Sequence, residues 1–412
     1  MLGLGYIGLP TALLFAQHYQ VLGVDINPSL ITSLKNGILP FNEMGLIELY
    51  NRVKSNFTPS CQVEESDAFI IAVPTPLEES IKTAELKHVR SAAEMISECL
   101  NPDNLVVLES TVPPGTSEHV VIPLLLKNGL DDKDINFVHC PERAIPGNTL
   151  HEMIHNDRII GANSQHAAIR AEGIYSSFVK GRIHLTDLRT AEFVKLMENT
   201  YRDVNIALAN EFAQMGQEVG INIWDAIGLA NLHPRVKILR PGPGVGGHCI
   251  AIDPWFLTES STTTRMVNLA RSINESMPNV VMNGIRPLLQ DIKKPIITIL
   301  GVAYKGNVDD WRETPALKLI KLAENEGYTV KLHDPHVKKF PYPILDLNNA
   351  LENSDCIILV TDHVTFQNID PGKITMRTKN LFDTRNILDH KKWHDSGFIV
   401  KVLGNGKRKI PC

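Results

Sequence analysis

The 412-residue chain lacks several features that would assign it to a particular class of protein. Its six cysteines have no paired spacing, which argues against a disulfide framework and indicates reduced thiols. No stretch of eighteen uninterrupted apolar residues occurs, so no membrane span is expected. Lys and Arg number 41 against 46 Asp and Glu, and the net charge of −5 leaves no overall basic footprint for nucleic acid. These absences predict a cytoplasmic protein with a small-molecule partner. The cysteines are Cys61, Cys99, Cys140, Cys249, Cys356 and Cys412.

The length exceeds what one hydrophobic core supports, so two or three domains are expected. Residues 1–165 alternate apolar strands with helices, which predicts a doubly wound parallel sheet. Residues 166–285 are dominated by long helical stretches, and residues 286–412 repeat the first pattern. The predicted fold is therefore α/β, with two Rossmann-like doubly wound parallel-sheet domains joined by a long-helix central domain.

The central helices are expected at Thr190–Val219 and at Thr264–Leu289. The second crosses Met277-Pro278, where a kink or a break is expected. The first carries an apolar stripe at helical spacing, which predicts either core packing or the interface of a homodimer. The stripe is Phe193, Leu196, Thr200, Val204, Leu208 and Phe212.

A glycine fingerprint stands at the beginning of the chain, in the run Gly3-Leu4-Gly5-Tyr6-Ile7-Gly8. It precedes a predicted helix and then an apolar strand, Val21–Asp25, that ends in the acid. Such a turn holds a pyrophosphate at a helix N-terminus, and the acid holds an adenosine ribose. The acid favours NAD over NADP, although Asp25 could instead cap the turn at Asn27-Pro28. The first strand is expected to be trimmed or abbreviated, because Met1 and Leu2 alone precede Gly3, and no signal peptide is expected.

Polar residues follow the predicted strands at their carboxyl ends, the edge where doubly wound sheets bind ligands. Pro74 and Thr75 follow one strand, Glu109-Ser110-Thr111 the next, and Pro141-Glu142-Arg143 the third. We therefore expect Pro74, Thr75 and Thr111 beside the dinucleotide.

The segment Pro241-Gly242-Pro243-Gly244-Val245-Gly246-Gly247-His248-Cys249 places a thiol after a glycine-rich run, and Asp253 follows it. Glycines expose backbone N–H groups, which favour a thiolate nucleophile. A structural turn with a buried, inert cysteine is the alternative interpretation. A thiolate that adds to an aldehyde gives a thiohemiacetal, and a second hydride loss gives a thioester. Cys249 would thus make a dehydrogenase a four-electron enzyme.

This chemistry develops negative charge on oxygen and ends with hydrolysis by water. Lys195 and Asn199, spaced i, i+4 on a predicted helix, suit the oxyanion as cation and amide donor. Lys195 could equally be a solvated helix residue. Asp253 and Glu142 are candidate carboxylates for the water, and Thr111 could hold it.

These motifs together resemble the UDP-glucose/GDP-mannose dehydrogenase family over essentially the whole chain. The resemblance rests on Gly3–Gly8, Val73–Pro76, Glu109–Thr111, Pro141–Arg143, Lys195–Asn199, Gly242–Asp253, Tyr304-Lys305, Asp310–Pro315 and Asp383–Arg385. It implies NAD as cofactor, with Cys249 as nucleophile and Lys195 as oxyanion lysine. It also implies that Asn199 and Asp253 handle the water and the oxyanion, and that Glu142 is catalytic.

The resemblance further implies a UDP-N-acetylhexosamine substrate, oxidised at C6 for a surface polysaccharide. Arg side chains suit the two phosphates. Arg312 is expected at the cofactor. The expected substrate-binding residues are Glu142, Arg143, Lys195, Asn199, Arg235, Gly242, Gly244, Gly246, Gly247, Tyr304, Lys305 and Arg385.

Two other functions fit parts of the sequence. A two-electron hydroxyacid dehydrogenase would share the cofactor domain but has no use for the Cys249 segment. A regulator that senses NAD or a nucleotide sugar would bind without turnover. No metal is expected, because His333 and His336 have no third ligand nearby in the sequence.

Overall fold

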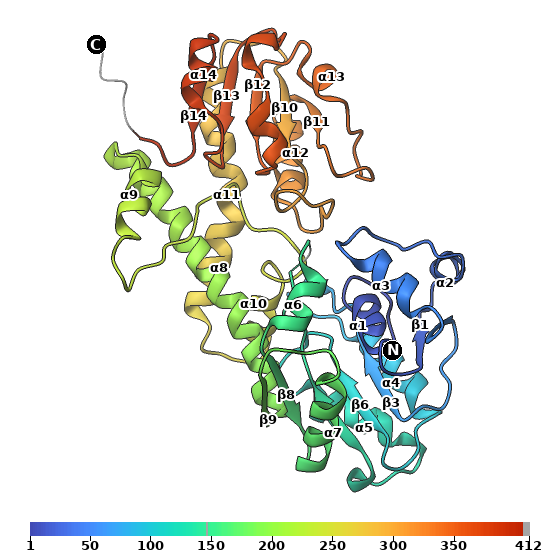
Figure 1. Ribbon diagram of the computed structural model, residues 1–412. Helices are drawn as coiled ribbons and strands as arrows, with labels where there is room; N and C mark the ends of the chain where they lie inside the picture. The colour runs from blue at the N-terminus through green and yellow to red at the C-terminus, as the bar shows by residue number, and fades with distance from the viewer. Residues whose placement is uncertain (146, 407–412) are drawn as a thin grey trace. The chain divides into compact units, whose positions relative to one another are not determined.

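The computed structural model describes residues 1–145 and 147–406; Pro146 and residues 407–412, including Cys412, lie outside the described residues. The chain divides into two compact units (Figure 1). Unit 1 contains Met1–Glu198 and Trp255–Thr263, and unit 2 contains Asn199–Pro254 and Thr264–Cys412. No helix in the described part of the chain is both long and apolar enough to cross a bilayer.

The main sheet of unit 1 has the order β3-β6-β7-β8-β9, parallel except for the antiparallel pair β7 and β8. A second pair, β1 and β2, is joined to it through Leu2, which forms bridges with Val24 and Ile71. The order β2-β1-Leu2-β3-β6-β7 is that of a doubly wound dinucleotide-binding sheet. The strands are β1 Val21–Val24, β2 Phe57–Ser60, β3 Ala68–Ile71, β6 Leu105–Leu108, β7 Asn136–His139, β8 Arg158–Ala162 and β9 Ile183–Asp187, and a hairpin is formed by β4 Leu77–Glu78 and β5 Thr83–Ala84.

The buried strand β6 shows how both faces of this sheet are covered. Leu105 and Val107 join the core that includes α1, α3 and α7, whereas Val106 and Leu108 join the core that includes α4 and α5. Alternate residues of a strand face opposite sides, so this apolar run requires helices on both faces. The helices are α1 Gly8–Phe15, α2 Pro28–Lys35, α3 Leu46–Val53, α4 Lys87–Ser97, α5 Ile122–Leu125, α6 Thr149–His155 and α7 Gln165–Tyr175.

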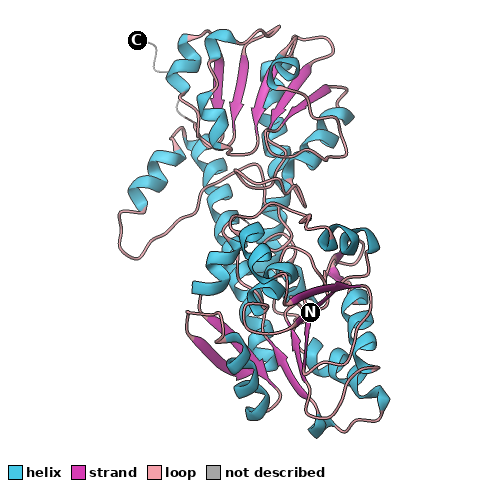
Figure 2. Ribbon diagram, turned by 45° about the vertical axis from the view of Figure 1, so that its right-hand side comes forward, coloured by secondary structure: helices cyan, strands magenta, loops and turns pink. Residues whose placement is uncertain are grey.

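Unit 2 contains a parallel sheet of order β11-β10-β12-β13-β14. Figure 2 shows helices on both of its faces. The connections reverse direction between β10 and β12, which makes the carboxyl ends of these strands the topological switch point where ligands bind. Its elements are β10 Ile296–Leu300, α12 Pro315–Asn325, β11 Thr329–His333, α13 Leu347–Leu351, β12 Cys356–Leu359, β13 Asn380–Asp383, α14 His390–Asp395 and β14 Ile399–Val402.

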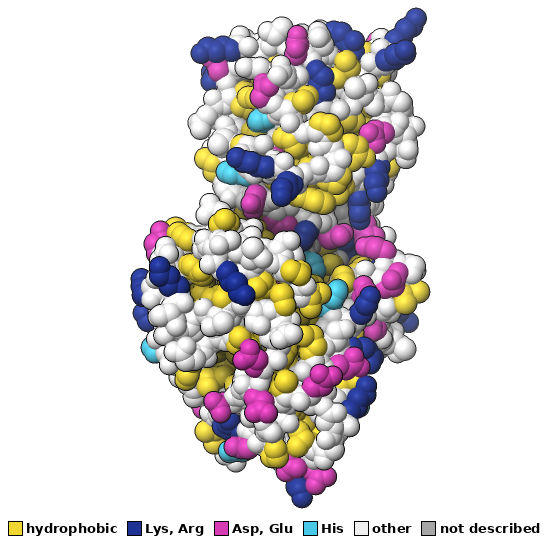
Figure 3. All heavy atoms as spheres, turned by 90° about the vertical axis from the view of Figure 1, so that its right-hand side faces the viewer, with side chains coloured by type: hydrophobic (Ala, Val, Ile, Leu, Met, Phe, Trp, Pro, Cys, Tyr) yellow, Lys and Arg dark blue, Asp and Glu magenta, His cyan; other side chains and the backbone are white. Residues whose placement is uncertain are grey.

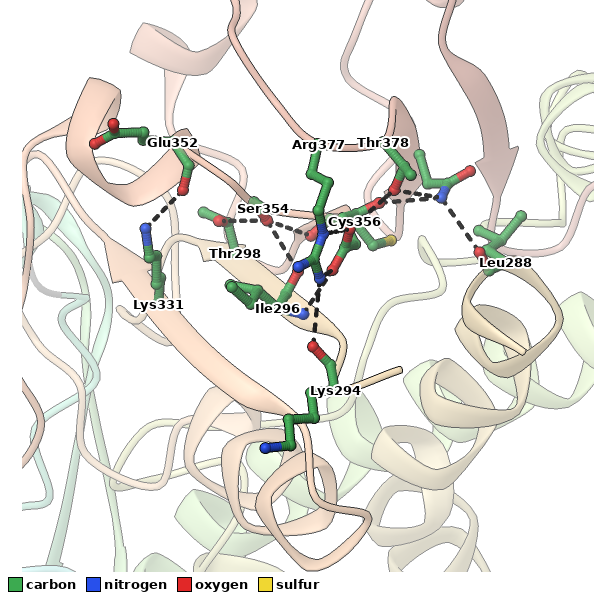
Figure 4. A network of polar contacts seen from close by, with 12 residues as sticks. Leu288, Lys294, Ile296, Thr298, Lys331, Glu352, Ser354, Cys356, Arg377 and Thr378 are labelled. Carbon is green, nitrogen blue, oxygen red and sulfur yellow. Dashed lines mark hydrogen bonds and ion pairs between the residues drawn. The ribbon is translucent and has the colours of Figure 1, made fainter. Parts of the chain in front are cut away.

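At the amino-terminal ends of these strands lies a polar network around Asp355 (Figure 4). The Asp355 carboxylate accepts hydrogen bonds from the backbone N–H of Ile296 at 2.8 Å and from Arg377 Nε at 2.6 Å. Thr378 donates its hydroxyl to the Asp355 carbonyl at 2.8 Å. These bonds satisfy backbone groups at the beginnings of the strands, so we assign this end of the sheet a structural role.

Four further helices complete the chain: α8 Leu188–Val219, α9 Ile223–Ala230, α10 Asp253–Glu259 and α11 Arg265–Leu289. The two long central helices predicted from the sequence are therefore confirmed. Of the kink or break expected at Pro278, a break does not occur, because α11 continues through this residue, and a kink stays a prediction. Pro278 leaves the Asn274 carbonyl without its helical N–H partner, and that carbonyl lies against Gly244. Of the expected stripe on α8, Leu196 and Thr200 are buried, whereas Phe193 and Leu208 are exposed.

The predicted α/β fold, with parallel-sheet domains at the two ends of the chain and a helical domain between them, is confirmed. The sheet of unit 1 continues past residue 165, because β8 and β9 extend it to Asp187. The division into three domains at residues 165 and 285 stays a prediction. On the face drawn in Figure 3, basic side chains are interspersed with acidic ones, so that face has no continuous basic surface.

A pair of helical glycines provides a matched test of packing in unit 2. A Cβ on Gly284 of α11 would lie 2.4 Å from a ring carbon of buried Phe382, whereas a Cβ on Gly228 of α9 would meet nothing within 4 Å. We expect Gly284→Ala to destabilise unit 2 by about 1–3 kcal/mol through overpacking. Gly228→Ala should be neutral or stabilising by up to about 1 kcal/mol. Denaturant unfolding measures both, and equal effects would contradict the packing.

Candidate active site

The glycine fingerprint of unit 1 forms the turn between Leu2 and α1. A Cβ on Gly8 would lie 1.9 Å from the Gly3 carbonyl oxygen, and one on Gly3, whose φ is +89°, would lie 2.4 Å from the Ala72 oxygen. The protein itself therefore requires these two glycines. Gly5 is different, because a Cβ there would meet nothing within 4 Å. The space left open at Gly5 lets a ligand approach the backbone, which is the role of the middle glycine in a pyrophosphate-binding turn.

Asp25 ties this turn to the end of β1. Its Oδ2 accepts the backbone N–H of Leu4 at 3.0 Å, and its Oδ1 accepts that of Asn27 at 2.9 Å. Asn27 in turn caps α2 by accepting from Ser29 and Leu30. Asp25 thus caps the turn at Asn27 and also lies beside the glycine turn. The turn, the open Gly5 and the half-buried acid fit a bound dinucleotide.

The loops after β3 and β6 are held together beside this turn. The Ser110 hydroxyl lies 2.9 Å from the Val73 N–H, which donates to it, and 2.7 Å from the Val73 carbonyl, which accepts from it. Thr75 donates its hydroxyl to the Thr111 carbonyl at 2.8 Å. The structure therefore brings Thr75 and Thr111 together, with Pro74 exposed next to them.

Glu142 lies in a buried charged cluster. Arg158 donates to Glu142 Oε2 at 2.7 Å, and the backbone N–H groups of Arg143 and Ala144 donate to Oε1 at 2.6 and 2.8 Å. Although burial acts to raise it, the pKa of Glu142 is lowered by Arg158 and by these N–H donors. Both carboxylate oxygens are thus engaged by the protein. A direct catalytic role for Glu142 stays a prediction.

Arg158 is 4% exposed and also lies 3.7 Å from Glu109. Its guanidinium stacks 4.8 Å from the ring centroid of Tyr175, whose hydroxyl donates to Glu109 Oε1 at 2.6 Å. Glu109 Oε2 is buried and has no hydrogen-bond partner among the described residues. Burial raises the pKa of Glu109 to about 7, against the opposing charge of Arg158.

Arg143 and Lys195 differ in how far they are engaged. Arg143 donates from Nε to Glu198 at 3.1 Å and from Nη1 to the Asp157 carbonyl at 2.7 Å. Lys195 of α8 is 7% exposed, and its ammonium makes no hydrogen bond or ion pair with a described residue. A mostly buried lysine without a protein partner is suited to an anionic ligand, which supports a functional interpretation over a solvated one.

In unit 2 the glycine-rich segment packs directly on the loop that follows β10. A Cβ on Gly246 would lie 2.6 Å from the Glu313 oxygen, and one on Gly247, with φ +85°, would lie 2.8 Å from the Tyr304 ring. Gly247 also donates its N–H to the Arg312 carbonyl at 2.9 Å. Any side chain at these positions would displace the segment, so its glycines set where Cys249 stands.

Cys249 follows this contact as an exposed thiol. Its carbonyl accepts the N–H of Asp253 at 2.8 Å in the turn that leads into α10. Asp253 is buried and accepts a hydrogen bond from the Asn199 amide, and Arg202 donates to the Asn199 oxygen. The structure thus groups Asn199 and Asp253 and joins them to Cys249 by one turn of backbone. The exposure of the thiol argues against the buried, inert interpretation.

Tyr304 and Arg312 are close enough to Cys249 to interact with its charge. Burial raises the pKa of Tyr304 to about 12, and the charges of Asp310 and Cys249 add to this. Arg312 holds Asp310 through bonds of 2.6–3.1 Å, so the expected cofactor arginine belongs to unit 2 and is paired there. Its role at the cofactor stays a prediction.

Arg385 follows β13 and borders the same segment. One of its Nη atoms would lie 2.5 Å from a Cβ on Gly242, and its guanidinium lies 3.5 Å from Asp362. Lys305 is exposed on the β10 loop at the switch point of the sheet, whereas Arg235 is exposed in the loop after α9. The structure therefore brings Gly242 and Arg385 together, and it shows no bond from Arg235 to them.

Sequence reasoning missed Arg158 and Asn210, and it named Asp310 within a matching motif without giving it a role. Arg158 pairs with two carboxylates, and Asn210 accepts the Gly242 N–H at 2.8 Å. A signal existed for Asp310, which stands two residues before Arg312. The sequence contains no comparable signal for Arg158. This residue comes sixteen positions after Glu142, at the start of β8, and the antiparallel pairing of β8 with β7 was not predicted.

Comparison with known proteins agrees with this geometry along the chain. The family models for the NAD binding, central and UDP binding domains of the UDP-glucose/GDP-mannose dehydrogenases match residues 1–179, 189–276 and 298–390. The chain belongs to this family. It is an NAD-dependent UDP-sugar dehydrogenase, an oxidoreductase, and the expected cofactor is confirmed.

Individual relatives are similar over nearly their whole length. A UDP-N-acetyl-D-mannosamine dehydrogenase of Methanococcus maripaludis is 48% identical, over 98% of this chain and 96% of the relative. The structure of the enzyme of that name from Pyrococcus horikoshii is 41% identical with a TM-score of 0.93, over 99% of both chains. That of UDP-N-acetyl-mannosamine dehydrogenase from Staphylococcus aureus is 39% identical with a TM-score of 0.89, over 98% of this chain and 97% of that one.

The buried carboxyl of Glu109 leads to a pH prediction for unit 1. Burial raises its pKa from the ordinary 4.5 of a glutamate to about 7, so between these values the folded state keeps a proton that the unfolded chain has lost. Stability therefore falls as the pH rises through this window. We expect Glu109→Gln to melt at the same temperature as the parent near pH 4.5 and at a higher temperature above pH 7. Glu65→Gln, at an exposed position, is the control. A parent that is more stable than Glu109→Gln at pH 8 would contradict the assignment.

Proposed function

We propose that the protein oxidises UDP-N-acetyl-D-mannosamine at C6 to UDP-N-acetyl-D-mannosaminuronate, in two successive two-electron steps. The printed names of the relatives at 48% and 41% identity support this sugar. The exposed Cys249 at the end of a sterically fixed glycine segment is the observation that carries the two-step reaction.

Each step of the reaction can be written so that atoms and electrons balance. The C6 alcohol loses a hydride and a proton and becomes an aldehyde. The Cys249 sulfur then bonds to the aldehyde carbon, and the oxygen takes up a proton to give a thiohemiacetal. Loss of a second hydride and proton gives a thioester, and water breaks the carbon–sulfur bond to give the carboxylate and the thiol. The hydride acceptor would be NAD, one molecule for each oxidation, with the first NADH replaced by a second NAD before the thiohemiacetal is oxidised.

The roles of the remaining residues follow from their surroundings. Lys195 supplies a positive charge for the oxyanion, since the residue is mostly buried and its ammonium has no partner among the described residues. Asn199, one turn further along α8, is held by Asp253 and Arg202, so its amide is fixed in one orientation. Asp253 and Thr111 are assigned to the hydrolytic water. Glu142 acts by holding the turn at Arg143 and Ala144, and it takes part in proton transfer only if its bond to Arg158 opens.

The UDP moiety is assigned to the switch point of the unit 2 sheet. Lys305 and Arg385 come from the loops after β10 and β13, at the edge where ligands bind in this type of sheet. Tyr304 and the glycine segment form its floor. Arg143 and Arg235 are retained as substrate contacts. An N-acetylglucosamine substrate is the second candidate, because the two sugars differ only in the configuration at C2.

The test is NADH released per sugar, measured with UDP-N-acetyl-D-mannosamine and UDP-N-acetylglucosamine side by side. We expect two NADH per molecule of the first sugar, and a kcat/KM at least about tenfold lower for the second. One NADH per sugar would refute the two-step reaction. A reversed preference would assign the other epimer and leave the two-step reaction in place.

Cys249→Ala is the matched variant for the same assay, and Cys61→Ala, at another exposed cysteine, is its control. We expect uronate formation by Cys249→Ala to fall by at least about 10³-fold, the scale seen for loss of a nucleophile. Binding of the UDP-sugar should remain, because the glycine segment is unchanged. Unaltered uronate production would remove the thiol from the reaction.

We also infer that two copies associate through α8. Tyr201, Leu208, Met215 and Val219 are all exposed large apolar residues on this helix. The first three are spaced by seven residues, which places them on one side of the helix. An exposed apolar stripe of this kind indicates an interface.

Light scattering at micromolar concentration should give the mass of two chains, and Leu208→Glu together with Met215→Glu should give that of one. Glu211→Gln, at an exposed polar position of the same helix, should leave the dimer intact. A monomeric parent would contradict the interface.

A further inference from the structure

His363 of unit 2 is fully buried in the loop that follows β12 (residues 360–364, the β12 loop), and it takes no part in the proposed reaction. Its ring centroid lies 5.3 Å from that of Phe366 and 4.8 Å from that of His336. Burial of an imidazole is unfavourable unless its ring nitrogens are hydrogen-bonded. The partners of these two nitrogens therefore indicate what the residue does.

Both ring nitrogens of His363 have partners, and the partners together fix its tautomer. The backbone N–H of Asn307 donates to Nδ1 at 2.9 Å. Because a backbone amide nitrogen can only donate, Nδ1 accepts this bond and carries no proton. The single ring proton is therefore at Nε2, which donates to Asp334 Oδ2 at 3.0 Å. His363 thus joins the loop after β10 to the carboxylate that follows β11.

Asp334 corresponds in unit 2 to Asp25 in unit 1, because each acid directly follows a parallel strand and accepts backbone N–H groups of the neighbouring turn. Asp25 accepts two backbone N–H groups and stays half-buried. Asp334 is buried and accepts four, in addition to the bond from His363. The acid that would hold a ribose in a dinucleotide site is therefore fully engaged by the protein in unit 2.

The bond to Asn307 fixes the turn that carries Lys305. Asn307 stands two residues after Lys305 and has a φ of +62°, a left-handed conformation that asparagine tolerates. Its side-chain oxygen accepts the N–H of Val364 at 3.0 Å, so this residue is bonded to the β12 loop twice. A Cβ on Gly306, between the two, would lie 2.4 Å from the Asp362 carbonyl oxygen. The backbone on the carboxyl side of Lys305 is therefore set by the β12 loop.

The β12 loop also contacts the other side of this turn and the second cation assigned to UDP. Thr361 donates its hydroxyl to the carbonyl of Ala303, two residues before Lys305, at 2.6 Å. Asp362 Oδ1 lies 3.5 Å from Arg385 Nη2. The β12 loop therefore contacts both loops that carry the assigned cations. Lys305 itself is exposed, so the protein fixes it through its backbone, which lowers the conformational freedom that binding has to remove.

We propose that His363 is a positioning residue of the UDP site, which acts through Nδ1 by fixing the Asn307 N–H and with it the turn of Lys305. The bond from Nε2 to Asp334 holds the ring and contributes mainly to stability. This inference rests on the proposed placement of UDP at Lys305 and Arg385. Because His363 is buried behind the turn, we expect its loss to change the affinity for the UDP moiety rather than the rate of the oxidation steps.

Two substitutions in the full chain separate the two bonds of the ring. In His363→Asn the amide oxygen can stand near the position of Nδ1 and accept from Asn307, but the side chain is too short to reach Asp334. In His363→Gln the amide nitrogen can stand near the position of Nε2 and donate to Asp334, but no acceptor faces Asn307. Lys305→Met is the control for the placement of UDP. Calorimetry with UDP alone gives the Kd, and thermal unfolding and steady-state kinetics with the UDP-sugar complete the set.

We expect His363→Gln to bind UDP at least about tenfold more weakly than the parent, because the turn of Lys305 loses its anchor. Its KM for the UDP-sugar should rise by a similar factor while kcat changes by less than about twofold. Its melting temperature should stay within about 2 °C of the parent, since Asn307 is exposed and water can bond its N–H. His363→Asn should melt at least about 4 °C lower, because the buried Asp334 loses a donor, and should bind UDP within about threefold of the parent.

A purely structural role would make the affinity for UDP follow the melting temperature, so that His363→Asn would bind UDP more weakly than His363→Gln. That order, or equal UDP affinity in both variants while Lys305→Met binds at least about tenfold more weakly, would overturn the positioning role and leave the placement of UDP intact. Unchanged UDP binding by Lys305→Met would instead overturn the placement of UDP, and this inference with it.

A measurement on the parent needs no substitution. Long-range proton–nitrogen correlation spectra report which ring nitrogen of His363 carries the proton. We expect it at Nε2, as the bonds to Asn307 and Asp334 require. A proton at Nδ1 would exclude the bond from Asn307 and overturn the positioning role, even if one of the variants fails to fold.

Discussion

Both ligand-binding regions of this protein depend on one constraint, the approach of backbone to its neighbours at distances that a Cβ would forbid. In unit 1 the backbone of Gly8 touches the carbonyl of Gly3, and in unit 2 Gly246 and Gly247 touch the β10 loop. The first contact sets the turn that opens at Gly5, and the second sets the position of Cys249. Each region is therefore fixed by the absence of side chains rather than by their presence.

The charged side chains near these segments differ in whether the protein supplies them with partners. Glu142 receives three donors, and Arg158 lies between Glu142 and Glu109 in an interior that excludes water. Asn199 is held between Asp253 and Arg202. In contrast, Lys195 of unit 1 is mostly buried and makes no hydrogen bond or ion pair with a described residue. A lysine without a protein partner is suited to an anion.

Family membership and geometry decide different questions. The family models assign NAD, a UDP-sugar and dehydrogenation. The exposed thiol supports two successive oxidations by the same enzyme. The sugar itself rests on the names of relatives, since a change of configuration at one carbon alters one hydroxyl-sized contact and leaves the fold unchanged.

The sequence by itself determined the α/β plan, because continuous apolar runs such as Leu105–Leu108 require cover on both faces. It also determined the glycine turn, Asp25, the cysteine segment and the long helix α8, since these are local patterns of spacing. The structure excluded a break at Pro278, because α11 continues through this residue. Arg158 beside Glu142 and Asn210 beside Gly242 were decided only by the tertiary structure. Each of these joins groups distant along the chain, and local propensity contains no information about which distant groups will meet.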